Sequence, residues 1–88
     1  MNHFLKIWPQ HYEPLVQGYK TFEVRGNDRG FQKGDTLLFI ETREDIPGIG
    51  TGRTATAVVS YVHSGLGMAD GYVVLGVQNV EEHRRGRP

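Results

Sequence analysis

Residues 53–62, RTATAVVSYV, form the longest run rich in β-branched side chains in this chain. β-branched residues pack well on a pleated sheet and lose side-chain freedom in a helix, so the run predicts a strand. Its side chains alternate between Ala55, Ala57, Val59 and Tyr61 on one face and Thr56, Val58, Ser60 and Val62 on the other. We therefore expect this segment to be a central strand of a sheet.

Four other segments read as shorter strands: residues 3–8 (HFLKIW), 21–25 (TFEVR), 36–41 (TLLFIE) and 72–80 (YVVLGVQNV). Glycine-rich connections separate them, and residues 42–52 have the composition of an exposed loop. Short strands between turn-rich loops favour a barrel-like sheet over a helical bundle. The sequence predicts a mainly β (α+β) fold, a small β-barrel of about five strands with one or two short helices.

The segment PQHYEPLVQG, residues 9–18, is expected to be a short helix. Pro9 suits a first helical position, and Gly18 is placed to end the helix. Tyr12 and Leu15 lie on one face at helical spacing, so we expect Tyr12 in the core. Pro14 should keep the helix short or split it.

Length and composition limit the function classes. The chain has 88 residues, no cysteine, and ten Lys and Arg against ten Asp and Glu, which predicts one domain over residues 1–80 and no disulfide or thiolate site. Four histidines show no ligand spacing, so no metal and no cofactor is expected. No signal or membrane segment is recognised, so we expect a cytoplasmic protein without membrane contact. Residues 81–88 are expected to be a disordered polar tail, and the oligomeric state stays open.

The stretch GYKTFEVR, residues 18–25, concentrates charge in a neutral chain. On a strand, Glu23 and Arg25 share one face, opposite Phe22 and Val24. If the apolar pair faces the core, the charged pair faces solvent or a cleft, and the turn after Gly18 can direct Lys20 to the same side. The simplest interpretation is a solvated strand face with a weak surface ion pair.

The motif Gly-x-Lys-x-x-Glu-x-Arg in this stretch resembles the signature of ASCH domains, members of the PUA-like superfamily. The chain also looks like a small ASCH-like family of uncharacterised bacterial and phage proteins, and this resemblance covers residues 3–77, through LKI, NDR, FQKGD and GYVVL in the same order. It implies a β-barrel whose cleft, between helix and barrel, binds RNA or a modified nucleoside. Lys20, Glu23 and Arg25 then occupy the positions that line the cleft.

The chemistry of these residues fits that implication. Lys20 and Arg25 can hold phosphate oxygens, Arg25 as a bidentate fork, and Glu23 can accept from an exocyclic amine. Trp8 is a candidate for base stacking, and Lys6 shares its strand face. Weaker candidates are a phosphate contact at Arg53, an acid or base at His11, and polar contacts from Asn27, Asp28 and Arg29, whose equally good interpretation is turn formation.

Three functions remain open at this stage. The favoured one is an RNA-binding or modified-nucleoside-binding domain. A second is a hydrolase acting on RNA or on an acylated cytidine, since some ASCH-like proteins are amidohydrolases that use lysine, threonine and glutamate. Here Lys20 and Glu23 would act, with Thr21 as the substitute hydroxyl, because Glu23 holds the strand position that carries their threonine. A third is a phage-type regulator that binds another protein.

Overall fold

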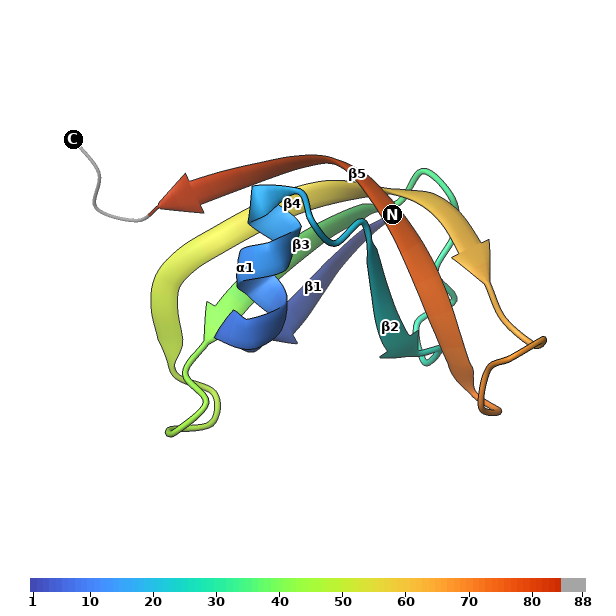
Figure 1. Cartoon of the computed structure of the whole chain (residues 1–88), viewed down its shortest axis with the longest axis horizontal. Coiled ribbons are helices and arrows are strands. Elements are labelled where there is room, and N and C mark those ends of the chain that lie inside the picture. Colours follow the sequence, from blue (N-terminus) through green and yellow to red (C-terminus); the bar gives the residue numbers. More distant parts are fainter. Residues whose placement is uncertain (85–88) are drawn as a thin grey trace.

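The computed structural model describes residues 1–84 and shows a curled, five-stranded half-barrel with one helix (Figure 1). Its elements are β1 (Asn2–Ile7), α1 (Pro9–Gln17), β2 (Phe22–Gly26), β3 (Thr36–Thr42), β4 (Gly50–His63) and β5 (Tyr72–Arg84). The strand order is β1-β3-β4-β5-β2, with β1 parallel to β3 and every other pair antiparallel. The mainly β prediction, with five strands and one short helix, is confirmed.

The long strands β4 and β5 carry the curvature of the sheet. Register shifts interrupt their pairing between Thr56 and Val58 and again between Val59 and Tyr61. Such irregularities bend a strand and increase its twist, which lets the sheet curl around α1. The helix lies on the concave side of the sheet (Figure 1).

The core fills the space between the sheet and the helix. Tyr12 and Leu15 of α1 are buried there, as the helical spacing predicts. The sheet contributes Leu5 and Ile7 from β1, together with buried residues of β3, β4 and β5: Leu37, Phe39, Ala55, Ala57, Val59, Val73, Leu75 and Val77.

The helix begins and ends where the sequence places it. Pro9 occupies the first turn, and Gly18 ends the helix with φ of 86°, a left-handed conformation that glycine adopts without a steric penalty. Pro14 lies inside the helix without splitting it. The prediction of one short helix holds, and no helix among residues 1–84 is long and apolar enough to cross a membrane.

The expected boundary of the tail is wrong by four residues. β5 continues through Glu81–Arg84, which pair with Arg53–Thr56 of β4. The polar composition after Val80 concealed this extension, because these residues lie where β5 runs past the core and need no apolar side chains to pair. The remainder of the expected tail, residues 85–88, lies outside the described residues.

The orientation of β2 also corrects the sequence interpretation. Phe22 and Val24 are about half exposed, whereas Glu23 is buried with 5% of its surface accessible. The apolar pair therefore faces outward and the charged face of β2 points into the concave side. β2 is an edge strand, so its inner face does not need to be apolar once a buried carboxylate has cationic partners.

The half-barrel stays open between its two edge strands, β1 and β2, which are not paired. We call this gap the seam. Two arginine side chains cross it: Nη2 of Arg25 donates to the Lys6 carbonyl at 2.9 Å, and Nη1 of Arg29 donates to the Phe4 carbonyl at 2.6 Å. Hydrogen bonds from side chains thus replace the strand pairing that would close the barrel.

Candidate functional site

A cleft of about 650 Å³ lies along the seam. β1 and the start of α1 form one wall with Lys6, Ile7, Trp8 and His11. The other wall consists of Lys20 and the whole of β2, Phe22–Gly26, and Thr42 and Tyr72 complete the lining. The cleft brings together five residues that the sequence analysis singled out for binding: Lys6, Trp8, Lys20, Glu23 and Arg25.

Lys20, Glu23 and Arg25 form one ion-paired cluster in this cleft. Lys20 Nζ donates to Glu23 Oε1 at 3.0 Å, Arg25 Nε donates to Glu23 Oε2 at 3.0 Å, and Arg25 Nη2 lies 2.8 Å from the same oxygen as an ion pair. All three side chains are at least three-quarters buried, so solvent screens the interaction less than it would on a surface. The interpretation as a solvated strand face is therefore wrong.

The same contacts change the role expected of Arg25. Its Nε and Nη2 are engaged by Glu23 and by the Lys6 carbonyl. Arg25 therefore cannot use Nε and Nη2 together to bind a phosphate as a bidentate fork. Within residues 1–84, Nη1 has no hydrogen-bond partner and can reach a ligand. Lys6, Lys20 and Arg25 against Glu23 leave the cleft with an excess of positive charge.

His11 joins this cluster from the first turns of α1. Its Nδ1 lies 3.5 Å from Lys20 Nζ, and its ring is exposed and lines the cleft. Because an ammonium group can only donate, this contact requires His11 Nδ1 to act as the acceptor. An imidazole ring thus lies beside the ion-paired cluster.

Aromatic side chains border the charged cluster. Trp8 at the N-cap of α1, Phe22 of β2 and Tyr72 of β5 line the cleft and are each 46–49% exposed. Lys20 Nζ also lies 5.5 Å from the ring centre of Phe22, within the range of a cation–π contact. Charged groups that can meet a phosphate and aromatic faces that can meet a base therefore occur in the same cleft.

Five other sequence candidates lie outside the cleft lining, and four of them, Thr21, Asn27, Asp28 and Arg29, flank β2. Thr21 is exposed, and its carbonyl accepts a hydrogen bond from the Val77 amide. Asn27 and Asp28 belong to the exposed turn after β2, which fits the turn interpretation. Arg29 crosses the seam instead of entering the cleft.

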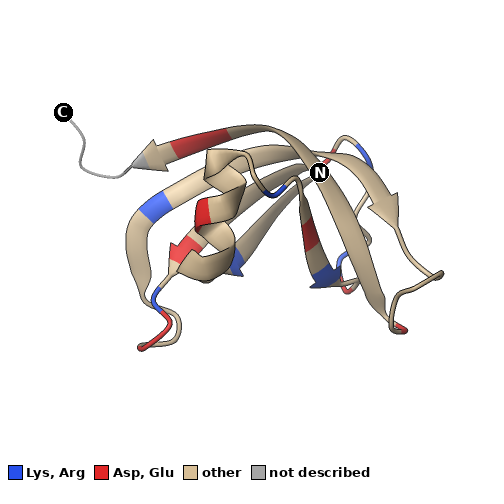
Figure 2. Cartoon of the chain, in the orientation of Figure 1, with Lys and Arg blue, Asp and Glu red and all other residues tan. Residues whose placement is uncertain are grey.

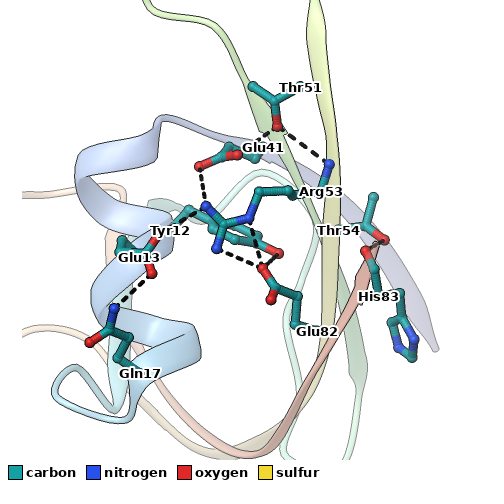
Figure 3. Close-up of polar contacts among 9 residues, drawn as sticks. All are labelled: Tyr12, Glu13, Gln17, Glu41, Thr51, Arg53, Thr54, Glu82 and His83. Carbon is teal, nitrogen blue, oxygen red and sulfur yellow. Dashed lines mark hydrogen bonds and ion pairs between the residues drawn. The ribbon is translucent and has the colours of Figure 1, made fainter. Parts of the chain in front are cut away.

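Arg53 was expected to contact a phosphate, but it lies outside the cleft lining. It is at the centre of an ionic cluster beside α1 (Figure 3), where it donates to Glu13 at 2.8 Å and to Glu82 at 2.8 Å and lies 3.8 Å from Glu41. Figure 2 shows the same arrangement, with acidic positions on α1, β3 and β5 around a basic position on β4. Of residues 42–52, only Thr42, the last residue of β3, lines the cleft.

This cluster is a structural anchor for α1. Arg53 stacks 4.8 Å from the ring centre of Tyr12, whose hydroxyl donates to Glu82 at 2.9 Å. Burial raises the pKa of Tyr12, and the hydrogen bond from Arg53 lowers the pKa of Glu13. Near neutral pH, Tyr12 therefore keeps its proton and donates to Glu82, and Glu13 is charged and pairs with Arg53. These two contacts fix α1 against β5 and β4.

Sequence reasoning missed several residues that line the cleft. Phe22 and Val24 were considered as a pair that faces the core, and Tyr72 was treated only as the start of the last strand, yet all three line the cleft. Ile7, Gly26 and Thr42 carry no signal in the sequence that distinguishes them from structural residues. Among residues 1–84, no group of three or more His, Asp or Glu side chains is placed to hold a metal ion.

Comparison with known proteins places the chain in a family. The "Uncharacterized 12.9 kDa protein in GpA 3'region" of Escherichia phage P2 is 30% identical over 73 residues, which are 83% of this chain and 64% of the phage protein. The model of a domain of unknown function, DUF3850, matches residues 2–77. The expectation of an uncharacterised family with phage members is confirmed in this form. Because the match covers most of the chain, this protein belongs to the DUF3850 family.

Proposed function

We propose that the cleft binds RNA at an unpaired base, or a modified nucleoside, and that the chain is an ASCH-like module of the PUA-like superfamily. The observation that carries the proposal is the meeting of the Lys20–Glu23–Arg25 cluster with three half-exposed aromatic rings in one cleft. Cationic groups position phosphates, and aromatic rings stack on bases at about 1–3 kcal/mol per base.

The charge distribution supports binding at one local site. The chain as a whole is neutral, so no general attraction to a polyanion exists, whereas the cleft carries excess positive charge. A ligand with one or a few phosphates fits this arrangement better than an extended duplex. We therefore expect a shallow dependence of affinity on salt concentration, because few counterions are released.

The test is to purify the chain at low salt, extract bound small molecules and nucleic acid, and identify them by mass spectrometry. Binding of short single-stranded RNA and of free nucleosides is then measured for the wild type and for Lys20→Ala. We expect Lys20→Ala to weaken binding about five- to hundredfold. Its matched control is Lys33→Ala, an exposed lysine outside the cleft lining, which should bind as the wild type does. Absence of any RNA or nucleoside binding by the wild type would overturn the proposal.

A second candidate function, hydrolysis of RNA or of a modified cytidine, is favoured by the contact between His11 and Lys20. An imidazole beside a cation is an arrangement that general acid–base catalysis uses. The amidohydrolase version has less support, since Thr21 does not line the cleft. Incubation of bound RNA with the wild type and with His11→Ala distinguishes the two functions: cleavage that disappears in His11→Ala indicates an enzyme, and intact RNA indicates a binding module.

A further inference from the structure

β2 has two edges of main-chain donors and acceptors: one faces β5 and the other faces the cleft. The bonds to the β5 side fix which residues point which way: Val77 donates to the Thr21 carbonyl at 2.9 Å, and Asn27 donates to the Gly71 carbonyl at 2.8 Å. In an antiparallel pair, residues that bond to the partner strand alternate with residues that do not. With the register of β2 on β5, Glu23 and Arg25 direct their main-chain groups to β5. Phe22, Val24 and Gly26 direct theirs away from it.

The groups that point away from β5 point into the cleft. Phe22, Val24 and Gly26 all line it, and β2 has no strand neighbour on that side. Within residues 1–84, no side chain and no main-chain group bonds to their cleft-facing N–H and C=O groups. On the β1 side of the seam, two main-chain carbonyls do have partners: Arg25 donates to the carbonyl of Lys6, and Arg29 donates to the carbonyl of Phe4. One edge of the seam is covered and the other is left open.

An extended residue presents its N–H and C=O groups side by side, pointing in the same direction. The Watson–Crick edge of every nucleobase carries a donor and an acceptor next to each other, so the two edges are complementary. A base bonded to a strand edge lies in the plane of the sheet. Its two faces then meet the side chains that β2 directs to opposite sides, with Phe22 and Val24 on one side and Glu23 and Arg25 on the other.

We propose that the main chain of β2 at Phe22, Val24 and Gly26 reads the Watson–Crick edge of an unpaired base. This rests on the proposed function and specifies its ligand: a base whose Watson–Crick edge is free. Glu23 is then a positioning residue, because both of its carboxylate oxygens are engaged in holding Lys20 and Arg25. A base-paired duplex and a base modified on its pairing edge are excluded as ligands.

The first test varies the ligand and uses only the wild-type chain. Single-stranded RNA of each base composition identifies the preferred base by fluorescence anisotropy. That base is then replaced by its form methylated at the ring nitrogen of the Watson–Crick edge, with a form methylated elsewhere as the matched control. We expect the edge-methylated RNA and the complementary duplex to bind at least about tenfold more weakly than the control. Equal binding of the two methylated forms overturns the inference.

The second test removes one main-chain donor. Val24→Pro deletes the cleft-facing N–H group without removing a bond to β5, and proline is tolerated on an edge strand when its nitrogen faces away from the ladder. Val24→Ala is the matched control, since it shortens the side chain and keeps the N–H group. We expect Val24→Pro to bind about three- to tenfold more weakly than Val24→Ala. Equal affinities would contradict the inference.

These outcomes separate the inference from the proposed function. If the wild type binds RNA or a nucleoside but tolerates methylation of the pairing edge, the proposed function stands and the inference fails. If the wild type binds neither, the proposed function fails and the inference fails with it. Should Val24→Pro not fold, the methylated-base comparison decides alone, because it requires no variant.

Discussion

Arg25 donates a hydrogen bond from Nη2 to the main-chain carbonyl of Lys6 at 2.9 Å, across the side of the sheet where β1 and β2 are not paired. The same guanidinium holds Glu23 in the cleft. Arg25 therefore takes part in both the candidate site and the closure of the seam. Arg29, which reaches the Phe4 carbonyl, takes part only in the closure.

This difference predicts separate effects for two similar substitutions. Arg25→Ala should weaken binding of single-stranded RNA by about 1–3 kcal/mol, because a cation is lost from the cleft and Glu23 loses a partner. Arg29→Ala should change binding by less than about 0.5 kcal/mol, although both variants lose one bond across the seam. Isothermal titration measures the binding and urea unfolding the stability. Equal losses of affinity in the two variants would refute the separation.

Glu23→Gln tests whether the carboxylate positions cations or reads a base. The amide keeps the shape of the side chain and removes the charge that Lys20 and Arg25 share. We expect a loss of about 1–3 kcal/mol in the free energy of unfolding, because two largely buried cations lose their counterion. Affinity should fall by a similar factor for all bases. A change in the order of preference among the four bases would instead assign base reading to Glu23.

Arg53→Ala should destabilise the fold and leave the cleft chemistry intact. The substitution removes the guanidinium that lies close to Glu13, Glu41 and Glu82, which should cost about 2–3 kcal/mol at pH 7. The hydrogen bond from Arg53 lowers the pKa of Glu13 from its usual 4.5. The stabilisation from this pair is therefore complete above pH 4.5 and is lost as pH falls through the lower pKa of the folded state. The deficit of the variant should therefore shrink below about pH 4.5.

Thermal unfolding at several pH values measures this deficit. Arg43→Ala is the control, because it removes an exposed ion pair with Asp45, which water and salt screen, and it should leave stability nearly unchanged. A fully folded and equally stable Arg53→Ala that has lost RNA binding would restore the sequence-based assignment of Arg53 as a phosphate contact.

The end of β5, residues 81–84, contributes to the stability of the fold. A chain that ends at Val80 lacks Glu82, which holds Tyr12 and Arg53, and also lacks the pairing of residues 81–84 with β4. Compared with a chain that ends at Arg84, it should melt at least about 5 °C lower, since a loss above 1 kcal/mol has this effect in a small domain. Calorimetry of the two chains is the measurement. Equal melting temperatures would support the polar-tail boundary at residue 81.

Asp35 predicts a loss of stability in acid. Hydrogen bonds from His3 and from the Gln32 amide lower the pKa of Asp35 from 3.8 to about 2. Because the folded-state pKa lies below the unfolded one, this stabilisation is complete above about pH 4 and is lost as pH falls toward 2. The difference in stability between the wild type and Asp35→Asn should therefore decrease over this range. A difference that stays constant between pH 5 and pH 2 would contradict the assignment.

Local patterns in the sequence were enough to predict the secondary structure. Alternating or β-branched segments between glycine-rich connections identified all five strands, and Pro9 and Gly18 marked the ends of the helix. These features depend on neighbours within a few residues, since strand and helix geometry repeat over that distance. The motif around Lys20, Glu23 and Arg25 was recognised for the same reason: its members lie within six positions on one strand and the preceding turn.

Only the tertiary structure decided what those residues meet. β2 buries its charged face because it is an edge strand whose carboxylate finds Lys20 and Arg25, and no local rule distinguishes this orientation from the usual one. Arg53 left the set of cleft residues because its partners lie 12, 29 and 40 positions away in the sequence. The energy of a buried charge depends on partners brought close by the curl of the sheet, and sequence spacing carries no information about that distance.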